Sequence, residues 1–216
     1  MSKNTYNGQL KLDKNRTIRT FIAFKLPEKI LLYISEIQKK LKSCGFKARW
    51  VRPENIHLTL KFLGDVEISD IGKISDAISE SADGFAPISI RAKGIGVFPS
   101  IKRPKVLWIG ISGQMDELVG LQQKLDENLS KLGFPKEKRA FNGHLTLARA
   151  KEYIDPKKMI DAMIKFKEFE SEPFTADRLI FFRSRLKPSG AEYSELASAE
   201  LAVNSKTSIP DKPDRP

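Results

Sequence analysis

The sequence IHLTLKFLG at residues 56–64 alternates apolar and polar side chains as a β-strand does, with His57 and Thr59 at polar positions. Its central tetrapeptide, HLTL, returns in GHLTLARAK at residues 143–151, and the two copies contain both histidines of the chain. Because side chains alternate across a strand, the histidine and threonine of each copy share one face. We predict that this face lines a groove. The apolar side chains that should face the core are Leu58, Leu60, Phe62, Leu145 and Leu147.

The motif belongs to a longer internal repeat. FIAF at residues 21–24 aligns with WIGI at 108–111, and His57 aligns with His144, both at an offset of 87 residues. Thr146 follows His144 as Thr59 follows His57. A repeat of this length indicates a duplicated βαβαβ lobe, not the short unit of a solenoid. Two such lobes usually face each other across a cleft, so the predicted fold is α+β and bilobal, with one motif in each lobe.

Hydrophobic periodicity predicts the same order of elements in both halves. Strands are predicted at residues 19–26, 55–63, 87–98, 105–112, 143–150, 174–186 and 191–201. Helices are predicted at residues 27–41, 69–81, 114–134 and 156–166. Pro27 and Pro156 suit the first turn of a helix, and Ser69 suits an N-cap. Gly94 and Gly96 are predicted bulge sites inside a strand.

Composition is typical of a globular protein. A chain of 216 residues with 40% hydrophobic residues can bury a core, and no apolar run approaches the roughly 20 residues of a membrane span. The polar first residues predict no secretory signal, and the single Cys44 fits a reducing cytosol, so we predict a cytoplasmic protein. We predict a flexible arm over residues 1–17, one bilobal domain over 18–203 and a disordered, Pro-rich tail over 204–216.

The net charge of +11 and the pI of about 9.6 favour an anionic partner, with nucleic acid first among the candidates. Charge alone is explained equally well by solubility.

Two histidines and two threonines on one groove suit phosphoryl transfer. One imidazole can act as a general base on the attacking oxygen while the other protonates the leaving oxygen. Hydroxyl groups can hold the non-bridging phosphate oxygens between them. This set of groups requires no metal and no cofactor.

Other interpretations of the histidines are less well supported. A single His-x-Thr on a strand would more often be structural than catalytic, but the equivalent positions in a repeat favour catalysis. A zinc site would need further ligands, and the chain has no His-x-His, no Cys-x-x-Cys and one cysteine. A Walker-type glycine loop is absent, which disfavours nucleoside triphosphate hydrolysis.

The doubled motif, His57-Leu58-Thr59-Leu60 and its copy at residues 144–147, resembles the two His-x-Thr-x signatures of the 2H phosphoesterase superfamily. The flanking sequences resemble one branch, the bacterial and archaeal RNA 2′,3′-cyclic phosphodiesterases, also called 2′-5′ RNA ligases. The segments that carry this resemblance, within residues 19–202, are RTFIAFKLPEKI, RWVRPENIHLTLKFLGDV, KVLWIGI, HLTLAR and SRLKPSGAEYSEL.

The resemblance implies two antiparallel sheets that form a V-shaped cleft, with helices outside. It implies metal-independent opening of an RNA 2′,3′-cyclic phosphate to a 2′-phosphate, with no cofactor. His57 would be the proton donor and His144 the proton acceptor, while Thr59 and Thr146 would bind phosphate. The implied substrates are RNA ends, including tRNA fragments, or cyclic nucleotides; we expect a monomer and no membrane partner.

The branch has an arginine after the second motif, which falls on Arg149 and implies a phosphate contact. Strict alternation would point Arg149 at the core, so a bulge or the strand end must turn it, or it is structural. The branch usually has proline where this chain has Gly143, which puts the local strand geometry in question.

Further residues could contact RNA. Trp50 and Arg52 precede the first motif and could stack on a base or bind a phosphate, although Trp50 could instead close the core. Lys61 is predicted on the face of His57, where it could add positive charge to the groove or simply be solvated. The run of Lys102, Arg103, Pro104 and Lys105 could form an RNA-binding rim or a solvated loop.

Two other functions compete with the phosphodiesterase. The first is a non-catalytic RNA-binding module on the same fold, which would not require two imidazoles. The second is joining of RNA ends by a 2′-5′ bond, which the same groups would catalyse as the reverse reaction. We treat this ligase activity as a side activity.

Overall fold

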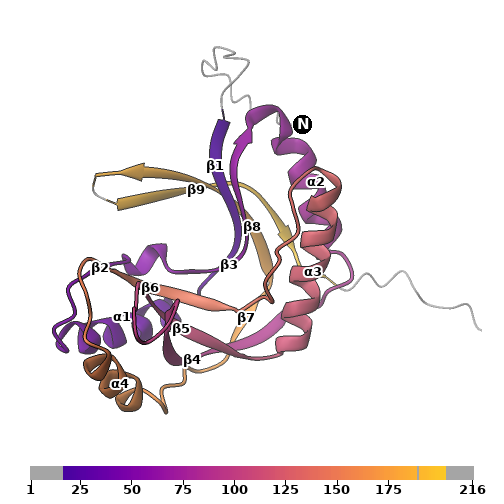
Figure 1. Cartoon of the computed structure of the whole chain (residues 1–216). Coiled ribbons are helices and arrows are strands. Elements are labelled where there is room, and N and C mark those ends of the chain that lie inside the picture. The colour runs from indigo at the N-terminus through magenta and orange to yellow at the C-terminus, as the bar shows by residue number, and fades with distance from the viewer. Residues whose placement is uncertain (1–16, 189, 203–216) are drawn as a thin grey trace, which may run out of the picture.

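The computed structural model describes residues 17–188 and 190–202, and these fold into nine strands and four α-helices (Figure 1). The strands are β1 (Thr17–Lys25), β2 (Ala48–Trp50), β3 (His57–Glu67), β4 (Ile88–Phe98), β5 (Val106–Gly113), β6 (His144–Ala150), β7 (Phe174–Ala176), β8 (Arg178–Lys187) and β9 (Gly190–Glu200). The helices are α1 (Glu28–Lys42), α2 (Ile71–Ala82), α3 (Met115–Lys131) and α4 (Pro156–Lys165), with short 3₁₀ turns at Pro53–Asn55 and Ile68–Asp70.

The strand order reflects the sequence repeat. It runs β7-β4-β5-β6-β3-β1-β8-β9, with β2 paired to β6, and the pairs are antiparallel. The central junction is β3 beside β6, the two motif strands, and the order is symmetric about it. The third strand of each repeat has changed sides: β4 lies beside β5 of the second repeat, and β8 lies beside β1 of the first. Neither repeat therefore forms its half of the molecule alone.

The two halves of the sheet are joined by a single residue pair, Leu58 with Leu145. Such a narrow junction lets the halves diverge on either side, so the predicted pair of antiparallel sheets is one curled sheet in two lobes. The expected bilobal α+β architecture is confirmed. Helices α1 and α4 cover the outer side of one half, and α2 and α3 cover that of the other (Figure 1).

Each face of β1 serves a different purpose. Ile22 and Phe24 point outward and join the main core beneath the helices. Phe21 and Ala23 point to the inner face, where they form a small second cluster with residues of β8. This inner cluster supports the motif strand β3, which pairs with β1 along its length.

Helix α1 illustrates how the helical faces close the core. Its buried residues recur at three- and four-residue steps, which places them on one side of the helix. The helix is followed by Gly45, whose φ of +77° is a left-handed conformation that glycine adopts without strain.

Several local predictions differ from the structure. The strand predicted at 174–186 breaks at Asp177 into β7 and β8, and the three-residue β2 was not predicted. Ser69 lies in a 3₁₀ turn and α2 begins at Ile71. The pairing of β4 with β5 shifts register at Gly94, as predicted. Gly96 is not a bulge; a Cβ there would lie 2.2 Å from the Trp108 ring, so glycine makes room for the indole.

The predicted arm and tail lie outside the described residues, except that Thr17 begins β1. None of the helices within the described ranges is both long enough and apolar enough to cross a membrane.

Candidate active site

The motif strands bring the two histidines to the junction between the halves. His57 is the first residue of β3 and His144 is the first residue of β6, and each immediately precedes a member of the joining pair, Leu58 and Leu145. Both leucines are fully buried, whereas both histidines are half-buried, so the imidazoles lie on the inner face. They are near enough for the charge of one to affect the pKa of the other.

Both imidazoles are anchored in the same way. His57 Nδ1 lies 2.8 Å from the carbonyl oxygen of Asn55, and His144 Nδ1 lies 2.7 Å from that of Asn142. A carbonyl oxygen only accepts hydrogen bonds, so Nδ1 must donate and carry the proton. The neutral ring then has a free lone pair on Nε2, the atom available for proton transfer in the groove.

Sequence reasoning missed the anchoring residues, although a signal was present. An asparagine precedes each histidine by two residues, so the full repeat reads Asn-x-His-x-Thr. The amide of Asn55 also donates to the carbonyl of Ala191 at 2.7 Å, which ties the first motif to β9. Gly143 does not disturb the second copy, because the Asn142 bond to His144 matches that of the first.

Aromatic rings enclose His57. Phe21 stacks on it at 4.7 Å between ring centroids, and Tyr193 meets it edge-on at 5.3 Å. Burial among these rings lowers the pKa of His57 to about 4, and His144 lowers it further, while the Asn55 hydrogen bond opposes the shift. An empty cleft at neutral pH therefore holds a neutral His57.

The surroundings of His144 are aromatic but differ in arrangement. Phe98 meets the ring edge-on at 4.9 Å, and the Trp108 ring is 6.1 Å away. By the repeat, Trp108 occupies the place of Phe21, but its ring does not stack flat on the imidazole. The two ends of the site are thus related by the duplication without being identical.

The motif threonines lie on the inner face, as predicted. Thr59 pairs with Ala23 and Thr146 with Trp108, and both are half-buried. Within the part of the chain that the structure describes, neither hydroxyl has a hydrogen-bond partner in the protein. Both hydroxyl groups are free to donate to a bound anion.

A β-bulge follows each motif and changes which face the next residues occupy. In β6 the partner of Leu107 is Ala148 and that of Trp108 is Thr146, so Leu147 is the extra residue. Leu147 and Ala148 are consequently both buried, and Arg149 is exposed on the inner face, the face of His144. Either a bulge or the strand end would turn Arg149 away from the core. The structure shows a bulge.

The matching bulge in β3 corrects two predictions. Leu60 is the extra residue between Thr59 and Lys61, so Lys61 is buried at 3% exposure instead of facing the groove. Its ammonium group pairs with Asp126 of α3 and donates to the carbonyl of Pro135 at 2.6 Å. Phe62, predicted in the core, is 61% exposed. It occupies the position that Arg149 holds in the second repeat.

The two candidate residues before the first motif have different surroundings: Trp50 packs against the core, and Arg52 is exposed. Trp50 pairs with the buried Ala148 and packs against the core, with the Lys42 ammonium 5.5 Å from its ring centroid. Its ring therefore does not lie in the groove. Arg52 is exposed, donates to the carbonyl of Ala191 at 3.0 Å and pairs with Glu54 at 3.5 Å.

In the basic run at 102–105, the lysines and the arginine are exposed and Pro104 is buried.

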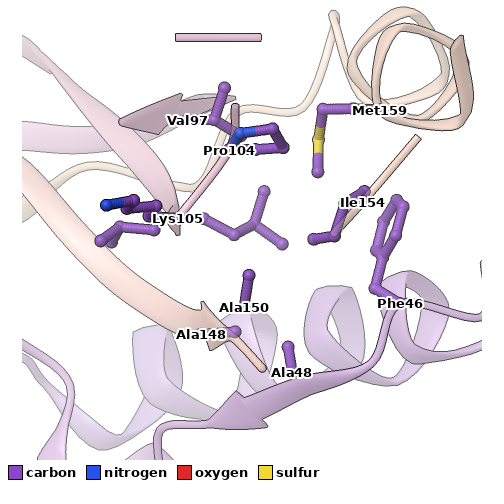
Figure 2. A pocket seen from close by; sticks show the side chains of 11 residues that line it. Phe46, Ala48, Val97, Pro104, Lys105, Ala148, Ala150, Ile154 and Met159 are labelled. Carbon is purple, nitrogen blue, oxygen red and sulfur yellow. The ribbon is translucent and has the colours of Figure 1, made fainter. Parts of the chain in front are cut away.

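A small cavity lies behind β6, away from the histidines (Figure 2). Its volume is about 10 Å³, and side chains of Phe46, Ala148 and Met159 are among those that point into it. A space of this size holds at most about one water molecule. The cavity is a gap in core packing and has no part in the chemistry of the groove.

Comparisons with known proteins agree with this geometry. The model of the LigT-like phosphoesterase family matches twice, over residues 24–108 and 109–193, once for each repeat. The chain belongs to this family. It is 37% identical to an RNA 2′,3′-cyclic phosphodiesterase of Thermotoga maritima, over 85% of this chain and 96% of that protein. It is 36% identical to the protein of the same name from Methanocaldococcus jannaschii, over 82% and 96%.

The fold of this chain is also seen in a solved structure. The crystal structure of a Thermus thermophilus protein is similar with a TM-score of 0.72 and 25% identity, over 87% of this chain and the whole of that one. This chain therefore shares its fold with a solved structure, and in this chain the doubled motif lies at the centre of the curled sheet.

Proposed function

We propose that the protein is an RNA 2′,3′-cyclic phosphodiesterase, which hydrolyses the cyclic phosphate at an RNA end to a 2′-phosphate. The observation that carries this proposal is the pair of imidazoles, each held through Nδ1 by a backbone carbonyl and each with Nε2 free. The names of the relatives from Thermotoga maritima and Methanocaldococcus jannaschii support the same activity.

In this mechanism His144 removes a proton from the attacking water and His57 gives a proton to the leaving 3′ oxygen. Thr59 and Thr146 donate to the non-bridging oxygens, and Arg149 supplies positive charge at one end of the groove. The bond from phosphorus to the 3′ oxygen breaks as the bond from phosphorus to water forms, leaving the phosphate on the 2′ oxygen. Positioning and charge stabilisation supply the rest of the rate enhancement.

The low pKa of His57 must be reconciled with the role of proton donor. A phosphate anion beside the imidazole favours its charged form, so binding of the substrate raises the pKa of His57 from its value of about 4 in the empty cleft. The proton is then delivered by an imidazolium whose aromatic surroundings destabilise its charge. Such a group is a strong acid, which suits protonation of an alkoxide.

Both imidazoles come from one chain, so we propose that a monomer suffices for activity. RNA ends, including those of tRNA fragments, are the proposed substrates, and cyclic mononucleotides are expected to react at the same site. Joining of RNA ends by a 2′-5′ bond is proposed as a side activity, because the same two groups serve the reverse reaction.

The decisive experiment incubates the protein with adenosine 2′,3′-cyclic phosphate and with a short RNA that ends in a cyclic phosphate, both in excess EDTA. We expect a 2′-phosphate product from both. Loss of activity in EDTA that zinc or manganese restores would refute the metal-independent mechanism, and a 3′-phosphate product would refute the assignment of the leaving oxygen. Binding of RNA without turnover would favour the non-catalytic RNA-binding module.

A further inference from the structure

The hairpin of β8 and β9 is fastened to the turn that precedes the first motif (Figure 1). Two donors from this segment meet on the carbonyl oxygen of Ala191 in β9: Arg52 Nη2 at 3.0 Å and Asn55 Nδ2 at 2.7 Å. β9 is an edge strand, which pairs with β8 and with no other strand of the described chain. Carbonyl groups on the free side of an edge strand have no partner in the sheet, so these side chains supply one.

Asn55 joins the hairpin to His57 through two hydrogen bonds. Its side-chain amide donates to β9, and its backbone carbonyl oxygen accepts from His57 Nδ1 at 2.8 Å. Asn55 is the last residue of a 3₁₀ turn, and the final carbonyl groups of a helical turn have no partner within it, so this oxygen is available to the imidazole. Because both groups belong to one residue, a rotation of its backbone would move the imidazole and strain the bond to the hairpin. The bond to Ala191 therefore resists movement of His57.

The hairpin also contacts the imidazole directly. Tyr193 follows Ala191 by two residues in β9, and its ring meets His57 edge-on with 5.3 Å between the ring centroids. Phe21, which stacks on the imidazole at 4.7 Å, contacts Tyr193 in turn at 5.0 Å. The position of the hairpin thus affects both the hydrogen-bond acceptor of His57 and the rings that surround it.

The second repeat holds its histidine differently. Asn142 lies two residues before His144, and its carbonyl oxygen accepts from Nδ1 at 2.7 Å, as in the first repeat. The Asn142 side chain is exposed, however, and its amide has no hydrogen-bond partner within residues 17–188 and 190–202. The backbone anchor is therefore common to both repeats, whereas the side-chain contact with the hairpin belongs to the first.

We propose that Asn55 is a positioning residue, whose side chain uses the β8–β9 hairpin to hold His57 against the leaving oxygen. The inference rests on the proposed phosphodiesterase activity and adds an asymmetry to it, because the hairpin restrains the proton donor and not the base. Proton transfer requires the donor nitrogen within hydrogen-bond reach of the leaving oxygen, so a small displacement of the imidazole slows this step. Thr59 and Thr146 hold the phosphate from other positions, so binding of the substrate should change little.

The activity test varies the residue and the leaving atom together. Asn55→Ala should lower kcat about tenfold on a substrate with a 3′ oxygen and change KM less than about twofold. Asn55→Gln, which keeps the amide on a longer side chain, should lower kcat less. With sulfur in place of the 3′ oxygen the leaving thiolate needs no proton, so Asn55→Ala should turn over this substrate nearly as fast as the unchanged protein. An equal loss on both substrates would overturn the proposal, because Asn55 would then act on the fold or on the base.

Nitrogen NMR of the two imidazoles tests the same contact without turnover. The unchanged protein should carry the proton of neutral His57 on Nδ1, and Asn55→Ala should share it between Nδ1 and Nε2, because a loosened carbonyl no longer selects one nitrogen. In Asn142→Ala, the matched change in the second repeat, His144 should keep its proton on Nδ1. An unchanged His57 signal in Asn55→Ala would overturn the proposal, whatever the activity. If no cyclic phosphate is opened while the His57 signal responds as expected, the proposed function fails and the control of His57 by Asn55 stands.

Discussion

Acidification should destabilise this protein through His57, and the size of the effect follows from its surroundings. Burial beside Phe21 and Tyr193 lowers the pKa of His57 from 6.5 to about 4 in the folded state. The unfolded chain exposes the imidazole and restores its ordinary pKa. Between about pH 6.5 and about pH 4 the unfolded state therefore binds more protons than the folded state, and stability falls as the pH falls through this range.

The magnitude can be worked out from the two pKa values. Above about pH 7 both states hold a neutral imidazole, so the group contributes no pH dependence there. At about pH 5 the unfolded state is favoured by proton uptake, which lowers the free energy of unfolding by about 2 kcal/mol. For a chain of this size the corresponding drop in melting temperature is about 4–8 °C.

The assay compares melting temperature and urea unfolding at about pH 7.5 and about pH 5 for the unchanged protein, His57→Gln and His144→Gln. Carboxylates such as Glu36, whose pKa is lowered by Lys39, also make the stability fall in acid. The assay therefore compares the loss of stability between the two pH values among the three proteins. His57→Gln should remove about 2 kcal/mol of the drop, since glutamine does not titrate. His144→Gln should retain most of it, because burial remains the main cause of the shift at His57. Equal pH dependence in all three proteins would refute the buried, neutral state of His57.

Three further predictions concern activity, stability and salt. His57→Ala and His144→Ala should each lower the turnover of a cyclic phosphate by about 10²–10⁴-fold at neutral pH in a single-turnover assay, and unchanged activity would point to a structural role. Lys61→Ala should cost about 3–5 kcal/mol in urea unfolding because it strands the buried carboxylate of Asp126, whereas Lys61→Met combined with Asp126→Leu should cost much less. The kcat/KM for a cyclic-phosphate-ended oligonucleotide should fall with rising salt more steeply than that for a cyclic mononucleotide; equal slopes would argue against an extended basic groove.

The sequence predicted the face that the motif side chains share, but it did not predict the faces of the residues that follow each motif. Alternation placed the histidines and threonines on one face, because the motif itself is regular strand. The same rule failed immediately after each motif, at Leu60 and Leu147, where a bulge adds one residue. The side chains beyond it then exchange faces, which is why Lys61 is buried and Arg149 is exposed. Nothing in the alternation of apolar residues specifies where a strand bulges.

The pairing of strands that are distant in the sequence could not be predicted from local sequence patterns either. The repeat predicted two lobes that face each other across a cleft, but it did not predict that β4 and β8 exchange halves, because pairing partners depend on the whole chain. The pKa of His57 has the same origin, since Tyr193 reaches it from the other end of the sequence. The aspects that could be predicted are those written within a few residues: the strand face, the paired motif and, with closer attention, the asparagine two residues before each histidine.

The repeat leaves open which imidazole protonates the leaving oxygen, and a change of leaving atom resolves it. A 2′,3′-cyclic phosphate with sulfur in place of the 3′ oxygen expels a thiolate, which needs no proton. If His57 is the donor, this substrate should restore much of the activity lost in His57→Ala, while His144→Ala should remain slow because water still requires a base. A pH profile alone would not separate the roles, since exchanging donor and acceptor leaves both limbs in place. Rescue of His144→Ala instead would exchange the two roles and make the neutral His57 of the empty cleft the base that activates water.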